Sequence, residues 1–166
     1  MSRRRVVSEE MVLRGGCQCG AVRYEARAAS RDAYYCHCRM CQRAFGHLSG
    51  IFCGVQRRTV TWERGEPAYY HSSKVARRGF CRECGSPLTF EYLELDELHL
   101  AVGSLDEPWR FRPVIHYGSE SIVEPFFTDD RLPRERTDED EEFMAMWRAA
   151  YGPDSVPGPL SGPPNT

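Results

Sequence analysis

The sequence predicts a mainly β fold with a short helix near its C-terminal end, and three observations support this. From Gly15 to about Leu105 the chain consists of short segments rich in aromatic and β-branched residues, with loose alternation of apolar and polar positions. Turn residues separate these segments at regular intervals. No strand–helix–strand rhythm, glycine-rich phosphate loop or internal repeat competes with this pattern. With 166 residues, the chain is long enough for one domain with its own hydrophobic core.

Seven segments are predicted to form strands, because each combines β-forming residues with flanking turn residues. They cover residues 21–26, 34–38, 48–55, 59–63, 68–73, 87–92 and 97–105. Residues 1–14 lack such a pattern and are predicted to be a ragged lead-in. Residues 153–166 are rich in proline, glycine and serine, with little to bury, and are predicted to be a disordered tail.

A short amphipathic helix is predicted within residues 135–152. Thr137, followed three positions later by Asp140, is a capping-box-like start, and the acidic first turn suits the helix dipole. Four apolar residues follow at helical spacing: Phe143, Met146, Trp147 and Ala150. Gly152 and Pro153 end the helix. The aromatic stripe is interpreted as a packing face, which docks on the rest of the chain or on a partner.

The eight cysteines fall into short clusters that indicate metal binding. They are spaced as C-x-C (Cys17, Cys19), C-x-C-x-x-C (Cys36, Cys38, Cys41), a single Cys53 and C-x-x-C (Cys81, Cys84). Disulfide frameworks seldom pair cysteines so close in sequence, whereas chelation of one metal ion requires such spacing. The chain is therefore predicted to hold metal in a reducing compartment.

The two simple pairs together supply the four thiolates of a structural zinc site. In a strand, residues two apart share a face, so a C-x-C can offer both sulfurs to one ion, and a C-x-x-C does so through a tight turn. Glycines flank both pairs, which lets the backbone turn closely around a metal. Such a site would pin the start of the domain to its middle, and its loss should be strongly destabilising.

The remaining triplet offers three ligands, and three protein ligands with an open position are typical of a catalytic zinc. The rivals for the fourth position are Cys53, His37 and His47. In a strand, His37 would point away from its cysteine neighbours, which argues against it. Cys53 is interpreted either as a small buried hydrophobe or as a ligand, and His47 either as an acid/base or as a surface residue.

Charge and hydropathy exclude several other classes of protein. The formal net charge is −2, and seven thiolates holding two zinc ions would bring it to about −5. A chain of this charge is not expected to bind nucleic acid, and the three arginines of "RRR" near its start are too few to change that. No apolar run approaches the length of a membrane span, and no apolar region follows the basic start as in a secretory signal. We expect a cytoplasmic protein that does not enter membranes.

These motifs resemble the glutathione-dependent formaldehyde-activating (GFA) enzyme family, also called the centromere-protein-V/GFA domain family. The resemblance rests on the ordered set "GGCQCGAVRYE", "YYCHCRMCQR", "YYHSSKVARRGFCRECGSPLTF", "LAVGSLDEP" and "RPVIH", and it covers about residues 15–134. The chain departs from the family pattern at Gln42, where a basic residue often follows the triplet. It also departs at 125–127, where "PFF" stands in place of a frequent tryptophan, and the predicted helix and tail look like additions.

The resemblance implies a β-tent-type fold, two zinc ions and a reaction class. One ion would be structural, on Cys17, Cys19, Cys81 and Cys84. The second would sit on Cys36, Cys38 and Cys41. The reaction would join glutathione and formaldehyde to give S-hydroxymethylglutathione, which is a carbon–sulfur lyase reaction in reverse. A substrate thiol would be the fourth ligand of the second zinc and would be deprotonated there, because the metal stabilises thiolate over thiol.

Histidines are the candidates for moving the proton in this reaction, because histidine titrates near neutral pH. His47, His71 and His116 are the candidates, with His47 and His116 preferred. Each of them is interpreted alternatively as a hydrogen-bonded histidine without a catalytic role.

Serines and arginines of the "HSSKVARR" segment are candidate substrate-binding residues. Ser72 and Ser73 would bind the peptide backbone of glutathione, or else satisfy their own strand ends. Arg77 and Arg78 would pair with a glutathione carboxylate, or else neutralise thiolate charge. A function from a different class fits the same features. The domain could be a non-catalytic zinc scaffold that binds a thiol, a peptide or a protein, because fold alone does not choose between these functions.

Overall fold

The computed structural model describes residues 11–124, 126 and 131–157. Most of the lead-in predicted for residues 1–14, and residues 158–166 of the predicted tail, lie outside the described residues. The first strand begins at Met11, ahead of the boundary predicted at Gly15. Residues 153–157 are described and begin with a turn after the C-terminal helix.

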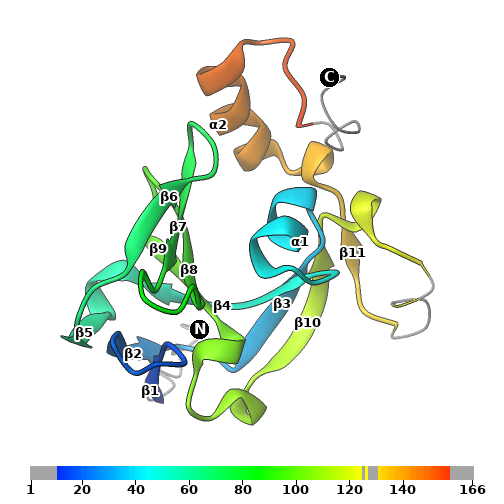
Figure 1. Cartoon of the computed structure of the whole chain (residues 1–166). Helices are drawn as coiled ribbons and strands as arrows, with labels where there is room; N and C mark the ends of the chain where they lie inside the picture. Colours follow the sequence, from blue (N-terminus) through cyan, green and yellow to red (C-terminus); the bar gives the residue numbers. More distant parts are fainter. Residues whose placement is uncertain (1–10, 125, 127–130, 158–166) are drawn as a thin grey trace, which may run out of the picture.

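The strands form two sheets, which confirms the predicted mainly β fold. A small antiparallel sheet has the order β1 (Met11–Gly16), β2 (Arg23–Ala28), β5 (Thr61–Arg64). The larger sheet has the order β11 (Arg134–Glu135), β10 (Arg112–Tyr117), β3 (Asp32–Cys36), β4 (Gly50–Gln56), β9 (Glu97–Ala101), β8 (Pro87–Tyr92), β7 (Ala76–Phe80), β6 (Ala68–His71). Its two halves, β6 to β9 on one side and β3 with β10 on the other, diverge from β4 like the sides of a tent (Figure 1).

All seven predicted strands are observed near their predicted positions, but most of them begin or end at other residues than predicted. β8 has the predicted bounds, and β2, β3, β4, β5, β6 and β9 overlap their predictions with shifted ends. Four strands, β1, β7, β10 and β11, were not predicted. β7 has the sequence "ARRGF", whose arginines and glycine carry little strand signal, and it is a strand because β6 and β8 pair with it on both sides.

The main hydrophobic core lies between the two sheets. Tyr24 of β2 is fully buried there, and its hydroxyl oxygen lies 2.7 Å from Oγ of Ser104. Leu88 of β8 and Leu100 of β9 are fully buried on the opposite side. Cys53 of β4 belongs to the same core, with no exposed surface, and its Sγ lies 3.9 Å from the carbonyl oxygen of Leu100. The structure therefore places Cys53 as a small buried hydrophobe.

Helix α1 (Arg39–Phe45) starts inside the cysteine triplet and was not predicted. Strand β3 ends at Cys36, and Cys38 becomes the N-cap of α1, with its Sγ accepting a hydrogen bond from the backbone N–H of Cys41 at 3.4 Å. Gly46 ends the helix in the left-handed conformation. The triplet is thus presented by a strand-to-helix junction, whereas the sequence analysis placed Cys36 and Cys38 in a strand and Cys41 after it.

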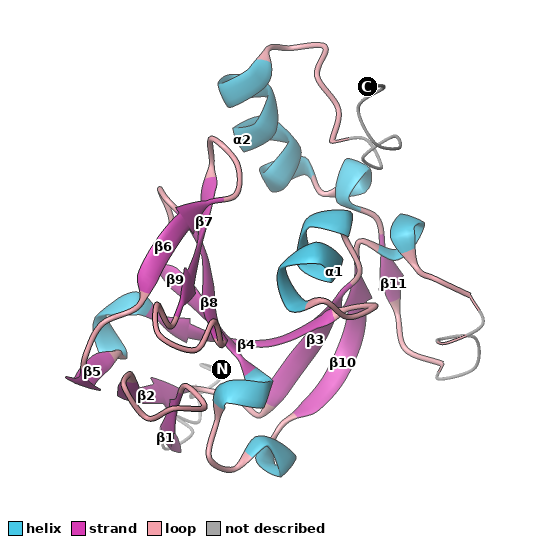
Figure 2. Cartoon of the chain, viewed as in Figure 1, coloured by secondary structure: helices cyan, strands magenta, loops and turns pink. Residues whose placement is uncertain are grey.

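Helix α2 (Glu141–Tyr151) crosses the open side of the large sheet (Figure 2). Its N-cap is Asp140, whose side chain accepts from the backbone N–H of Phe143 at 3.0 Å. The predicted cap was Thr137, which instead starts the 3-10 turn η5 (Thr137–Glu139) and donates to Glu120 at 2.6 Å. The helix was predicted correctly, but it begins one turn later than expected because Asp140 is the better-placed acceptor.

Loop contacts hold α2 against the rest of the chain. Lys74 donates its backbone N–H to the hydroxyl of Tyr151 at 2.7 Å, and its ammonium group to the carbonyl of Ala150 at 3.2 Å. At the other end, the hydroxyl of Tyr117 donates to Asp140 at 3.1 Å. Within the described part of the chain, no helix combines the length and the apolar character needed to cross a bilayer.

Candidate functional site

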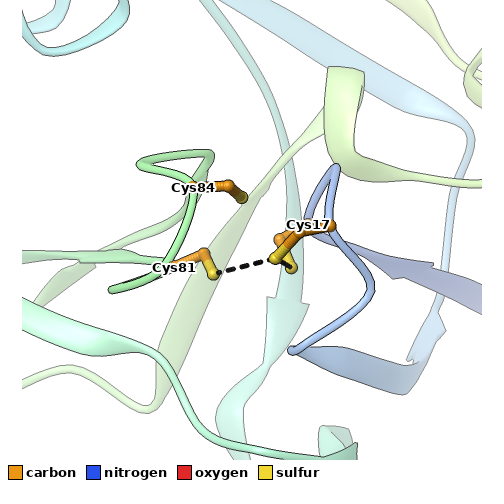
Figure 3. A group of neighbouring side chains, drawn as sticks. Cys17, Cys81 and Cys84 are labelled. Atoms are coloured by element: carbon orange, nitrogen blue, oxygen red, sulfur yellow. Dashed lines mark hydrogen bonds between the residues drawn. The ribbon is translucent and has the colours of Figure 1, made fainter.

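The first cysteine cluster joins two turns that are far apart in the sequence. Cys17 and Cys19 lie in the turn after β1, and Cys81 and Cys84 lie in the turn between β7 and β8. Figure 3 shows the side chains of Cys17, Cys81 and Cys84 pointing toward a common space. All four sulfurs lie within 4.8 Å of one another, with 3.5 Å between those of Cys17 and Cys19 and 3.8 Å between those of Cys19 and Cys81.

These separations fit a single metal ion. Tetrahedral coordination with metal–sulfur distances near 2.3 Å places the sulfurs about 3.8 Å apart. The first pair reaches this arrangement from a turn, although the sequence analysis expected a strand. Gly20 and Gly85, one in each turn, have positive φ values of 76° and 74°, which disfavour any residue with a side chain.

Ser86 connects the two turns of this cluster. Its hydroxyl accepts a hydrogen bond from the backbone N–H of Gln18 at 3.1 Å, and it lies 3.1 Å from Sγ of Cys84. Hydrogen bonds from the side chain and the backbone of Ser86 lower the pKa of the Cys84 thiol to about 5. The cluster is therefore a preassembled set of sulfurs that could hold a metal ion.

The second cluster, Cys36, Cys38 and Cys41, also has its three sulfurs within 4.8 Å of one another. The sulfurs of Cys36 and Cys38 are 3.5 Å apart, which again suits one metal ion. Among residues 11–124, 126 and 131–157, no histidine, aspartate, glutamate or further cysteine offers a fourth ligand atom to this group. His37 is fully buried on another side, where its Nε2 lies 2.7 Å from Nδ1 of His116.

Contacts within the triplet favour the thiolate form of one member, Cys38, whereas hydrogen bonds and burial raise the pKa of Cys36 and of Cys41. Hydrogen bonds from the thiols of Cys36 and Cys41 hold the pKa of Cys38 well below its ordinary value, and the backbone N–H of Cys41 and the charge of Arg78 act in the same direction. Arg78 Nη2 donates to Sγ of Cys41 at 3.3 Å. A buried guanidinium thus lies against the sulfurs and compensates part of their negative charge.

Arg78 has donors left over for a ligand. Its side chain lies over the ring of Phe90, 4.9 Å from the ring centre, and the residue is only 8% exposed. Its Nε and Nη1 atoms are buried and have no hydrogen-bond partner in the described structure. Because an unpaired buried donor is costly, these two atoms mark a place where an acceptor from a ligand would be stabilising.

A cavity of about 620 Å³ opens in front of the triplet and Arg78. Its lining residues come from both halves of the large sheet, from α1 and from α2. Aromatic residues of the sheet line it, namely Tyr34, Phe52, Phe90, Tyr92 and Tyr117. Helix α2 adds Phe143, Met146 and Trp147. A concave, mainly apolar space with a few convergent polar groups is the usual form of a small-molecule site.

The predicted substrate-binding residues separate into two groups. Ser72, Ser73 and Arg78 line the cavity. Arg77 does not, because neighbouring residues of β7 point to opposite faces: its Nε donates to Glu91 at 2.9 Å and its guanidinium stacks on Tyr69. Of the two serines, Ser72 Oγ lies 3.5 Å from the carbonyl of Ala76, a weak contact that leaves its hydroxyl able to serve a ligand.

The histidines singled out from the sequence lie away from the cavity lining. His47 and His71 are exposed, and Nδ1 of His47 accepts a weak 3.4 Å hydrogen bond from the backbone of Ser49. His116 is fully buried beside His37. The catalytic roles of His47 and His116 stay predictions.

His99, which the sequence analysis did not single out, lines the cavity instead. It lies on β9, where its ring packs edge-on to Tyr34 and against Phe90. Burial lowers the pKa of His99 to about 4, so the imidazole is neutral near pH 7 and its 3.8 Å approach to Glu97 is not an ion pair. Its Nδ1 is buried without a hydrogen-bond partner. The only feature of the sequence that could have indicated His99 as a site residue is its inward position in an apolar strand, "ELHLAV".

Fold and site together define a mainly β protein in which one four-sulfur cluster and one three-sulfur cluster could hold metal ions, the second of them facing an apolar cavity. The chain matches the model of the family described as "Glutathione-dependent formaldehyde-activating enzyme" over residues 12–120. It belongs to this GFA family, as the motif resemblance indicated.

Two further similarities agree with this membership. The chain is 32% identical, over 78 residues, to an "uncharacterized lyase" of Schizosaccharomyces pombe. That alignment covers 47% of this chain and 56% of the yeast protein, so the chain spans little more than half the length of this curated relative. A crystal structure of a Rhodobacter sphaeroides protein has a similar fold, with a TM-score of 0.51 at 23% identity, covering 74% of this chain and 99% of that one.

Proposed function

We propose that the chain is a zinc-dependent, carbon–sulfur lyase-like enzyme that forms or cleaves a thiol adduct such as S-hydroxymethylglutathione. One observation carries the proposal: a three-sulfur cluster, with no fourth protein ligand among the described residues, faces a ligand-sized cavity. The family description names glutathione and formaldehyde, and the yeast relative is named a lyase. We assign one Zn²⁺ to each cluster, because thiolates at these separations are a donor set that zinc prefers.

Zinc on Cys36, Cys38 and Cys41 would supply a binding position for the substrate sulfur as a fourth ligand and would favour its thiolate form. The protein contributes the rest of the site. Arg78 holds the sulfur cluster on one side. Its free Nε and Nη1 atoms lie on different edges of the guanidinium, and each could donate one hydrogen bond to an acceptor such as a glutathione carboxylate. Ser72 and Ser73 line the same cavity and would bind peptide groups of the thiol.

The reaction makes or breaks one carbon–sulfur bond and moves one proton. In the forming direction, the thiolate sulfur attacks the carbonyl carbon, a carbon–sulfur bond forms, and the carbonyl oxygen takes up a proton. In the cleaving direction, the adduct hydroxyl loses its proton as the carbon–sulfur bond breaks, which returns the thiolate and the carbonyl compound. The neutral imidazole of His99 has an unpaired nitrogen and a place on the cavity wall, so we assign it as the carrier of this proton. In the forming direction it accepts the proton of the thiol and passes it to the carbonyl oxygen. In the cleaving direction it accepts the proton of the adduct hydroxyl and returns it to the sulfur.

A titration of the cobalt-substituted protein with glutathione tests the proposal. If the second cluster takes the substrate sulfur, the thiolate-to-cobalt charge-transfer band should grow by about one thiolate per protein. S-Methylglutathione is the matched control, because its sulfur cannot become a thiolate, and it should leave the band unchanged. If glutathione also leaves the band unchanged with both metal sites filled, the enzyme proposal fails and the non-catalytic zinc scaffold becomes the better explanation.

A further inference from the structure

The cavity is much larger than the hydroxymethyl group of S-hydroxymethylglutathione requires. Its volume of about 620 Å³ lies in the range of sites for drug-sized ligands. Arg78 marks the metal end of the cavity, where it contacts Cys41. The part of the cavity under α2 is lined by different side chains, and their chemistry indicates which group of a ligand would lie there.

The walls under α2 are mainly aromatic and aliphatic, although Asp140 and Glu142 also line the cavity there. Phe143, Met146 and Trp147 of α2 face a wall that includes Tyr92, and the ring of Tyr92 lies 6.3 Å from that of Phe143. The rings of Phe143 and Trp147 are 5.7 Å apart, so they present a continuous aromatic surface. Such surfaces bind planar apolar groups by burial and by offset or edge-on ring contacts.

A few polar atoms stand unpartnered in these walls. The indole nitrogen of Trp147 and Nδ1 of His99 are both buried and have no hydrogen-bond partner in the described structure. Arg78, which is only 8% exposed, adds two more such atoms at the metal end of the cavity. An apolar lining with isolated polar atoms is the usual arrangement that orients a ligand.

The aromatic wall on α2 comes from outside the part of the chain that the family shares. The family match ends at residue 120, whereas α2 spans Glu141–Tyr151. The sulfur cluster and Arg78 therefore belong to the common part, and the apolar wall is supplied by a segment that this chain adds to it. Specificity for the group that lies under α2 would be a property of this chain.

From these observations we infer that the thiol adduct handled at the second cluster carries an aromatic or similarly bulky apolar group, which packs against Phe143 and Trp147 of α2. The inference rests on the proposed function, because it names the substrate class of that same site. The carbonyl compound that joins the thiol is then an apolar aldehyde or ketone larger than formaldehyde. The bond that forms and the proton that moves are the same as for formaldehyde.

Calorimetric titration of the zinc-loaded protein with two stable thioethers tests the inference. S-Benzylglutathione and S-methylglutathione differ only in the apolar group, and neither can form a thiolate or undergo the lyase reaction. We expect the benzyl compound to bind roughly tenfold more tightly or better, as burial of an aromatic ring predicts. Trp147→Ala should remove most of this advantage, and Trp147→Phe should restore much of it.

Trp109→Ala is the matched control variant, because Trp109 is 73% exposed and does not line the cavity. It should leave both affinities unchanged. Equal affinities for the two compounds, binding of neither, or a benzyl advantage that survives Trp147→Ala would each overturn the inference. The glutathione-dependent cobalt band would still decide the proposed function separately, because it depends on the thiolate and not on the apolar group.

Discussion

The two cysteine clusters use the same ligand atom but are built in different ways. The first draws its four sulfurs from two turns that are far apart in the sequence and adjacent in space, and Ser86 hydrogen-bonds to both turns. The second takes its three sulfurs from a single strand-to-helix junction and faces a cavity. A metal in the first cluster would join distant parts of the chain, whereas one in the second would join only neighbours. We therefore expect the first cluster to support the fold and the second to support binding.

The largest effect is expected from breaking the first cluster. Cys81 is fully buried, and Cys81→Ser removes one of the four thiolates that tie the turn after β1 to the turn before β8. Because metal binding and folding are coupled at such sites, the substitution should lower the free energy of unfolding by several kcal/mol. The variant should therefore not fold. Near-UV circular dichroism and protease sensitivity would show this, and a well-folded variant would contradict the structural role.

The equivalent change in the second cluster should act on binding. Cys38→Ser removes a sulfur that caps α1, and a serine hydroxyl can still accept the backbone hydrogen bond of Cys41. We expect the fold to remain while glutathione binding is lost by at least about a hundredfold, because the ligand set is incomplete. The measurement is the cobalt band on adding glutathione. An unaltered titration would show that the triplet does not hold the substrate sulfur.

Adjacent arginines of β7 allow a sharper comparison. Arg78→Gln removes the guanidinium at the sulfur of Cys41, and glutathione affinity should fall roughly tenfold to a hundredfold. Arg77→Gln is the control, because Arg77 pairs with Glu91 on the other face. Arg77→Gln should lower the free energy of unfolding and leave the affinity for glutathione nearly unchanged. Similar affinity losses in both variants would remove the specific role of Arg78.

Near neutral pH the smallest effect is expected from His99, because its contribution to stability changes only as the pH falls below 6.5. The folded chain holds His99 neutral with a pKa of about 4, whereas the unfolded chain has the ordinary value of 6.5. As pH falls from 6.5 to 4 the unfolded state therefore binds more protons, and up to roughly 3 kcal/mol of stability is lost across this window. His99→Gln should lack this component, seen as a flatter plot of unfolding free energy against pH. Identical slopes for the two proteins would show that His99 is not buried as described.

The metal ligands could be predicted from the sequence because metal sites depend on short-range spacing. Two pairs and a triplet of cysteines are recognisable whatever surrounds them, and the structure brings together the predicted sets. The same reasoning assigned the first pair to a strand, and it missed α1, because neither a turn around a metal nor a helix starting at a ligand has a periodic signal.

The rest of the cavity could not be predicted, because long-range pairing creates it. His99 reaches the cavity through the pairing of β9 with β4 and β8, and Trp147 reaches it through the docking of α2. β10 pairs in parallel with β3, a strand that lies far earlier in the sequence. The helix itself followed from its pattern, but the surface that it covers did not, since an aromatic stripe looks alike whether it fills a core or lines a cavity.

The first cluster also has a consequence for the order in which the protein takes shape during synthesis. Cys19 and Cys81 lie 62 positions apart in the chain, and the whole triplet lies between them. Closing such a loop lowers the conformational entropy of the nascent chain, at a free-energy cost on the order of 4 kcal/mol. The free energy of metal binding to a four-thiolate site is larger than this cost. All four ligands have been made once the ribosome has added Cys84, well before α2. Metal capture at the first cluster can therefore close the first half of the chain while the cavity still has no α2 across it.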